Sequence, residues 1–269
     1  MFKYVTGLLA VAVAAGCSDK RPETAARVRP AATPVAAADT VPGSGGIIPR
    51  AVALAQVPAS LRQPGQLLEA WHWPDANGEN LLVVFRGEAA APPPPAAAAS
   101  YAFNELTTGA GPAYTAQLSV RQYVRRQGAY AELWRLRDFV TNCPLRLTLR
   151  PLPGSTAITD LDHDGRSETT LIYALACRSG PASAGLKLIM REGKAKYALR
   201  GATVRPEPPA AAGPGPPTDP CCLNELSPAQ RRLGEPGGYY QTEAGFRGAP
   251  PAFLPFARQH WQKFSSENN

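Results

Sequence analysis

Residues 145–150 read Leu-Arg-Leu-Thr-Leu-Arg, so apolar and polar side chains alternate with a period of two. Successive side chains of a β-strand point to opposite faces of the sheet, whereas those of a helix repeat about every 3.6 residues. This segment therefore predicts a strand with one face in a core and the other face in solvent. The stretch from Leu118 to Arg125 alternates in the same way.

Further short segments have the composition of strands, and most of them are joined by short turns. They are Gln66–Trp73, Asn80–Arg86, Ala131–Arg137, Thr156–Thr159, Thr169–Cys177, Lys187–Arg191 and Lys196–Arg200. Residues 74–79 and Glu192-Gly193 supply the turn chemistry for two hairpins. We therefore predict a mainly β fold, an antiparallel meander in one or two packed sheets.

One helix is predicted, at about residues 255–264. Its apolar side chains recur every three or four residues, directly after a proline suited to a first helical turn. These residues are Phe256, Ala257, His260, Trp261 and Phe264. Such a helix would cover an open face of the sheet.

The composition predicts one folded domain with Pro-rich attachments. The chain has 269 residues, of which 29 are Pro and 24 are Gly, and 44% are hydrophobic. This supports one core and excludes a protein that is helical throughout. Stretches rich in Ala and Pro bury too little apolar surface to offset chain entropy. We predict a disordered tether at 18–46, a β-rich domain at 47–202 with a Pro/Ala loop at 87–100, a Pro-rich linker at 203–220 and a C-terminal segment at 221–269.

The first 17 residues have the pattern of an export signal. Lys3 precedes the apolar run Val5–Ala15, which is too short to span a bilayer, and the run leads into Gly16-Cys17. This ending resembles the lipobox of bacterial lipoproteins, although Ala14 stands where Leu is usual. The resemblance implies a signal peptide at 1–17, lipidation of Cys17 and the lipid bilayer as a partner, with the outer membrane favoured by Ser18. The alternative is an ordinary signal peptide cut near Ala15.

The most specific chemical motif is Asp-Leu-Asp-His-Asp-Gly-Arg-Ser-Glu at residues 160–168. Its alternate carboxylates and its glycine match the start of an EF-hand calcium loop, but the twelfth position is Leu171 and lacks the required Glu. The motif is more similar to the calcium loops between strands of integrin-like propeller repeats, which implies a structural Ca²⁺. The implied ligands are the side chains of Asp160, Asp162 and Asp164, the Arg166 carbonyl, and Glu168 directly or through water. The alternative is a solvated acidic turn.

Four cysteines follow Cys17, an even number that suits an exported and oxidised domain. Three pairings are possible. A Cys143–Cys177 bridge would enclose the acidic loop and would stabilise the fold by about 3 to 4 kcal/mol. It would leave Cys221 and Cys222 as a vicinal disulfide or as two thiols. A zinc site is disfavoured, because CxxC spacing and a nearby histidine are both missing.

The formal net charge is +7, and arginines alternate with apolar residues along the predicted strands. Several of them should therefore emerge on one solvent-facing side of the sheet. Guanidinium groups pair well with phosphate and carboxylate, so this surface predicts contact with an anionic glycan, the alternative being a solvated face. Nucleic acid is not expected as a partner. The arginines are Arg121, Arg125, Arg135, Arg137, Arg146 and Arg150.

The sequence lacks the common catalytic and nucleotide-binding motifs. The motifs GxSxG, HExxH, GxxxxGK[ST] and GxGxxG do not occur in it. A carboxylate pair for glycoside chemistry remains conceivable, but no spacing singles out two of the candidate residues. These are Glu69, Asp75, Glu79, Glu105, Glu132 and Asp138.

Residues 131–201 resemble a family of small exported proteins named for the biosynthesis of surface polysaccharide, including lipopolysaccharide. The matching segments include Asp138-Phe139, Ile158–Asp162, Tyr173–Cys177, Lys187–Met190 and Lys196–Gly201. The resemblance implies a non-enzymatic lipoprotein of the cell envelope that contributes to the assembly, display or binding of an anionic surface polysaccharide. The alternatives are a purely structural envelope protein and a glycan-processing enzyme.

Overall fold

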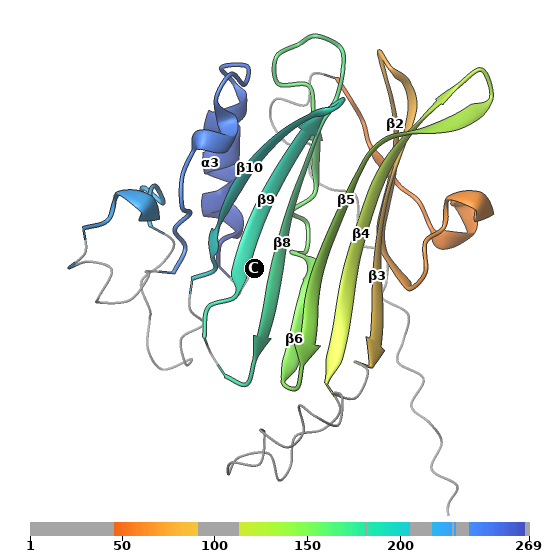
Figure 1. The fold of residues 1–269 in the computed structure, drawn as a ribbon. Coiled ribbons are helices and arrows are strands. Elements are labelled where there is room, and N and C mark those ends of the chain that lie inside the picture. The colour runs from red at the N-terminus through yellow and green to blue at the C-terminus, as the bar shows by residue number, and fades with distance from the viewer. Residues whose placement is uncertain are drawn as a thin grey trace, which may run out of the picture. The chain divides into compact units, whose positions relative to one another are not determined.

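Two antiparallel sheets and one C-terminal helix make up the fold, which confirms the mainly β prediction. A computed structural model describes residues 46–90, 113–180, 182–204, 217–227, 229 and 237–266. Sheet A has the strand order β1-β2-β3-β4-β5. Sheet B has the order β10-β9-β8-β6, with β7 paired to β8. Figure 1 shows the chain passing from sheet A to sheet B where β5 leads into β6.

Each strand of sheet A pairs with the next along the chain, as a meander requires. The strands are β1 (Arg50–Ala51), β2 (Gln66–Asp75), β3 (Gly78–Ala90), β4 (Tyr114–Arg126) and β5 (Ala129–Cys143). The turn between β4 and β5 is Gln127-Gly128, and both residues have positive φ, 51° and 85°. Turns of this kind twist as the flanking strands do, so they close a tight hairpin.

Sheet B is built around β8, which pairs with β6, β7 and β9. Its strands are β6 (Arg146–Pro151), β7 (Ala157–Thr159), β8 (Glu168–Arg178), β9 (Gly185–Glu192) and β10 (Ala195–Ala202). The hairpin predicted around Glu192-Gly193 forms between β9 and β10. Residues 168–174 of β8 are all buried, because this strand has neighbours on both edges and packing on both faces.

The largest hydrophobic cluster takes side chains from one face of each sheet, so the two sheets pack on each other. Trp73, Leu82 and Leu118 come from sheet A, and Leu149 and Tyr173 come from sheet B. Leu147 also packs against this cluster, so two of the three alternating leucines point inward as predicted. Leu145 precedes β6 and is 48% exposed. Burial of each such side chain is worth about 1.5 to 3 kcal/mol.

The other face of each sheet is covered by a terminal part of the domain. Val57 and Leu61, near the short 3-10 helices Leu54–Gln56 and Ala59–Leu61, pack on sheet A. Helix α3 (Phe253–Phe264) packs on sheet B, and Figure 1 shows it beside β9 and β10. The helix begins two residues before the predicted 255, because Pro255 is accommodated in its first turn. Two more 3-10 helices, Leu223–Glu225 and Ala244–Phe246, complete the described elements.

The domain boundaries differ from the predicted ones at two places. Strand β3 continues through Ala90, four residues into the predicted loop 87–100; the rest of that loop lies outside the described residues. Thr203, assigned to the linker 203–220, is fully buried, and its backbone N–H donates to the Ala184 carbonyl at 2.8 Å. The predicted signal peptide at 1–17 and the tether up to residue 45 also lie outside the described residues.

Cys143 and Cys177 form a disulfide, with their Cα atoms 5.5 Å apart. Cys143 ends β5 in sheet A and Cys177 lies near the end of β8 in sheet B. The predicted bridge is therefore confirmed, and it ties one sheet to the other. Cys221 and Cys222 remain as a vicinal pair.

Candidate metal centre

The acidic loop, residues 160–167, connects β7 to β8. Thr159 and Glu168 stand directly opposite each other where the two strands meet. Within the loop, Asp164 Oδ1 accepts a hydrogen bond from the Arg166 backbone N–H at 2.7 Å. His163 and Gly165 have positive φ, 60° and 81°, so the chain turns back on itself sharply.

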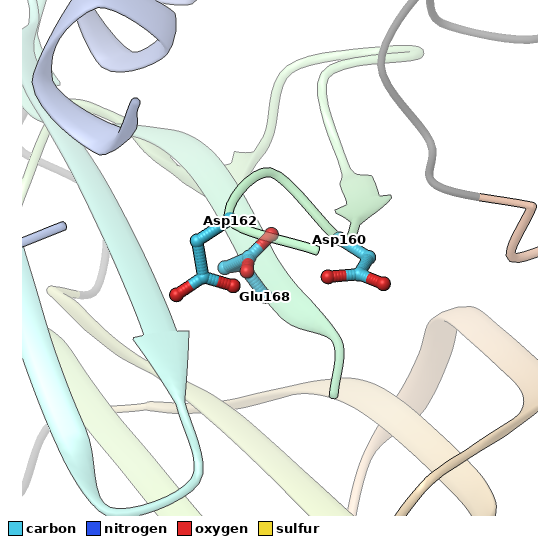
Figure 2. Close-up of side chains that lie close together, drawn as sticks. All are labelled: Asp160, Asp162 and Glu168. Atoms are coloured by element: carbon cyan, nitrogen blue, oxygen red, sulfur yellow. The ribbon is translucent and has the colours of Figure 1, made fainter. Parts of the chain in front are cut away.

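Three carboxylates gather at the base of this loop. One oxygen each of Asp160, Asp162 and Glu168 lies within 4.8 Å of the other two. Figure 2 shows Asp162 and Glu168 directed toward each other, with Asp160 on the neighbouring arm of the loop. Carboxylate oxygens in this number and proximity are the ligands that hard divalent cations prefer.

Two oxygens of this group are buried without a hydrogen-bond partner. They are Asp160 Oδ1 and Glu168 Oε1, for which no donor exists among the described residues. The Glu168 side chain is 0% exposed and that of Asp160 is 5% exposed. Oxygen Oε2 of Glu168 is satisfied, because it accepts from Thr159 Oγ1 at 2.8 Å and from the Leu161 N–H at 2.9 Å. A buried acceptor without a partner is costly, so the group has a place for a positive ligand.

The electrostatics of the cluster also favour a bound cation. Burial raises the pKa of Glu168 to about 7, and the negative charge of Asp162 contributes to the increase. A nearby cation would stabilise the ionised form and offset both effects.

A further carboxylate, Glu192, joins the cluster from the end of β9. It is directly opposite Glu168 in the pairing of β8 with β9. One of its oxygens lies within 4.8 Å of oxygens of Asp162 and Asp164. Two glutamates in direct opposition repel each other unless a proton or a cation lies between them. Glu192 is not among the residues predicted from the sequence, because the only local signal at this residue is that of a turn.

The acidic loop is fastened to sheet A by the turn between β2 and β3. Asp75 Oδ2 accepts hydrogen bonds from Ser167 N at 3.0 Å and from Ser167 Oγ at 2.6 Å. The Ser167 hydroxyl in turn accepts from the indole N–H of buried Trp73 at 2.8 Å. The Ala76 N–H donates to the Gly165 carbonyl at 2.7 Å. These contacts couple the geometry of the cluster to the packing of the two sheets.

Asp160 also lines a pocket of about 510 Å³. Arg50, His72 and Glu79 line this pocket, and His72 Nε2 lies 3.1 Å from Glu79 Oε2. Asp164 groups with Asp162 and Glu192. The side chain of Arg166, whose carbonyl is the predicted ligand, is exposed, with its Nε 3.9 Å from Asp164 Oδ2.

The six predicted arginines divide between the two sheets. Arg121, Arg125, Arg135 and Arg137 lie on the face of sheet A that packs against the N-terminal segment, whereas Arg146 and Arg150 lie on the helix-bearing face of sheet B. Arg121 and Arg135 are direct cross-strand neighbours, and both pair with Glu132, at 3.2 and 2.6 Å. The structure therefore brings four of the six together and neutralises part of their charge.

The carboxylates considered for glycoside chemistry have individual partners in the structure, apart from Glu105, which lies outside the described residues. Glu69 accepts from Thr156 and Trp71, and burial raises its pKa. Asp75 accepts a hydrogen bond from Ser167, and Asp138 accepts one from the Tyr173 hydroxyl at 2.8 Å. Glu79 forms an ion pair with His72, and Glu132 forms ion pairs with two arginines.

Comparisons with known proteins found no family model that matches the chain, and no significantly similar curated protein or solved structure. The described part of the chain contains no helix long and apolar enough to cross a membrane.

Proposed function

We propose that the acidic loop holds a calcium ion that stabilises the packing of the two sheets. The observation that carries the proposal is the pair of buried oxygens, Asp160 Oδ1 and Glu168 Oε1, that have no donor among the described residues. An ion at this position would be ligated by Asp160, Asp162 and Glu168, with water completing the six to eight oxygens that calcium takes.

Calcium fits the site better than zinc or magnesium. The described cluster offers oxygen ligands and no cysteine or histidine, which disfavours zinc. Calcium also tolerates the irregular arrangement of carboxylates on a turn, whereas magnesium demands a near-ideal octahedron. Because Ser167 and Gly165 are hydrogen-bonded to the β2–β3 turn, ordering of the loop would also order the contact between the sheets.

The proposal is tested by calcium titration of the protein after treatment with a chelator. Calcium should raise the melting temperature by mass action, and equimolar magnesium should raise it less. Glu168→Gln and Asp160→Asn should each abolish most of the increase, while the exposed Glu88→Gln should respond like the parent. A Glu168→Gln protein whose melting temperature still follows calcium as the parent does would contradict the assignment.

We also propose that the chain is a lipid-anchored protein of the bacterial cell envelope, located at the outer membrane. The proposal rests on the lipobox-like ending at Cys17 and on the resemblance of residues 131–201. The Cys143–Cys177 disulfide supports it, because structural disulfides persist in oxidising compartments. Cys17→Ala should remove incorporation of labelled palmitate and move the protein from the membrane fraction to the soluble fraction. A parent protein without label would contradict it.

The proposed role in the envelope is the binding or assembly of an anionic surface polysaccharide, without catalysis. The proposal rests on the resemblance and is supported by the net charge of +7. Deletion of the gene followed by analysis of the surface glycan tests this role, since a structural envelope protein would leave the glycan unchanged. Restoration by a Cys17-intact copy is the control.

A further inference from the structure

Two like-charged pairs face each other across β9 and β10. Lys187 is directly opposite Arg200, and Arg191 is directly opposite Lys196. Ile189 and Ala198, the pair midway between them, belong to the cluster between the sheets. Because side chains alternate along a strand, all four cations lie on the face of sheet B that is turned toward sheet A. This basic inner face is separate from the arginines predicted from the sequence.

Only one of the four cations has a carboxylate partner among the described residues. Lys187 Nζ pairs with Asp138, which also accepts from Tyr173. Arg191 donates to backbone carbonyls of Lys194 and Arg135, and its guanidinium lies 5.5 Å from the centre of the Trp134 ring. Its Nε is buried without a partner in the described structure.

Lys196 and Arg200 are exposed and have no carboxylate partner within the described ranges. Like charges directly opposite each other destabilise a sheet. The pKa of Lys196 is lowered by partial desolvation of its amine and then by the positive charges of Arg191, Arg200 and Lys187, and the Asp138 carboxylate offsets this only in part. Four cations and one carboxylate leave the face with net positive charge that an anion would neutralise.

The spacing of the cations favours an extended anionic chain. The two pairs are four residues apart along the strands, which is about 13 Å. A single phosphate can contact one pair, whereas a polymer with repeating anionic groups can contact both. The exposed large apolar residues lie on segments other than β9 and β10, so they add no apolar contact to this face. They are Ile48, Leu54, Tyr114, Phe139 and Leu145. Lys187 is only 26% exposed, so a flat bilayer surface reaches it poorly.

We propose that the basic inner face of β9 and β10 binds an acidic polysaccharide, whose carboxylate or phosphate groups contact the Lys187/Arg200 and Arg191/Lys196 pairs. This inference rests on the anionic glycan proposed above as the partner, and it names the surface that takes it.

The test is a binding assay with hyaluronate, with phosphorylated lipopolysaccharide and with neutral dextran, at one fixed calcium concentration. The parent should bind the two anionic glycans in low salt, lose them in high salt, and ignore dextran. Lys196→Glu/Arg200→Glu should weaken binding at least tenfold, whereas the matched control Arg125→Glu/Arg137→Glu on sheet A should change it less than twofold. The first variant should keep the parent's melting temperature or exceed it, because it replaces two repulsive pairs with attractive ones.

The possible results separate this inference from the proposed function. Binding that is lost in the Arg125/Arg137 variant but kept in the Lys196/Arg200 variant overturns the inference and leaves the glycan partner in place. Absence of binding to both anionic glycans in low salt overturns both. Tighter binding to phosphatidylglycerol vesicles or to a single-stranded oligonucleotide than to either glycan, abolished by the Lys196/Arg200 variant, overturns the choice of a polysaccharide.

Discussion

At the scale of single residues, His260 shows how a titratable group is used for packing. It lies on α3 at 8% exposure, and its Nε2–H donates to the Ser155 carbonyl at 2.6 Å. Its ring stacks with Phe256 and contacts Phe264. A carbonyl only accepts hydrogen bonds, so Nε2 carries the proton of the neutral ring. Burial lowers the pKa of His260 to about 4.

This lowered pKa predicts a loss of stability in acid. Between about pH 6.5 and pH 4 the unfolded chain binds a proton at His260 that the folded protein does not bind. The free energy of unfolding therefore decreases by about 3 kcal/mol as the pH is lowered across this range. Urea unfolding of the parent and of His260→Gln at each pH isolates this contribution, because other groups titrate equally in both. The difference between the two should vary across this range. A constant difference for His260→Gln would contradict the role.

At the scale of elements, α3 and the chain before it complete sheet B. Gly201 of β10 allows the backbone to approach Tyr239, since a Cβ at this position would overlap the Tyr239 carbonyl oxygen. The neighbouring Tyr240 and Trp261 are both fully buried, with ring centres 5.4 Å apart in an edge-to-face contact. The Trp261 indole N–H donates to the Gly238 carbonyl at 2.7 Å. The C-terminal segment is therefore part of the same core as β8 and β9.

Truncation of Trp261 should test this dependence. Trp261→Ala removes a fully buried side chain and should lower the free energy of unfolding by about 3 to 5 kcal/mol. Gln259→Ala, on the exposed side of the same helix, should change it by less than about 0.5 kcal/mol. Both values come from urea unfolding followed by fluorescence and circular dichroism. Equal effects of the two substitutions would mean that α3 adds little to the stability of sheet B.

At the scale of the whole molecule, the two sheets are held by their shared core, by the Cys143–Cys177 disulfide and by the Asp75–Ser167 contact. The disulfide joins residues 34 apart in sequence, so its removal should lower the free energy of unfolding by about 3 to 4 kcal/mol. Cys143→Ala/Cys177→Ala measures this loss, and Cys221→Ser/Cys222→Ser is the control, because neighbouring cysteines close almost no loop. If the control lowered the free energy of unfolding as much as the first variant does, this account would be contradicted.

The sequence by itself determined the features that depend on neighbouring residues. Alternation predicts the strands, as at Leu147 and Leu149, and the residues between Trp73 and Asn80 predict a hairpin. The spacing of Asp160, Asp162, Asp164 and Glu168 predicts an acidic cluster. The structure places Asp160, Asp162 and Glu168 together, whereas Asp164 groups with Asp162 and Glu192. Side-chain period and turn conformation are local properties, so a single segment is enough to reveal them.

Only the tertiary structure decided which faces and strands meet. It brings Glu192 opposite Glu168, fastens Ser167 to Asp75, and places Arg146 on a different sheet from Arg121. The pairing of β8 with β9 and the packing of the sheets follow from the summed burial of many side chains distant in sequence. A short segment does not reveal this total, because each contact stabilises the fold little until the others have formed.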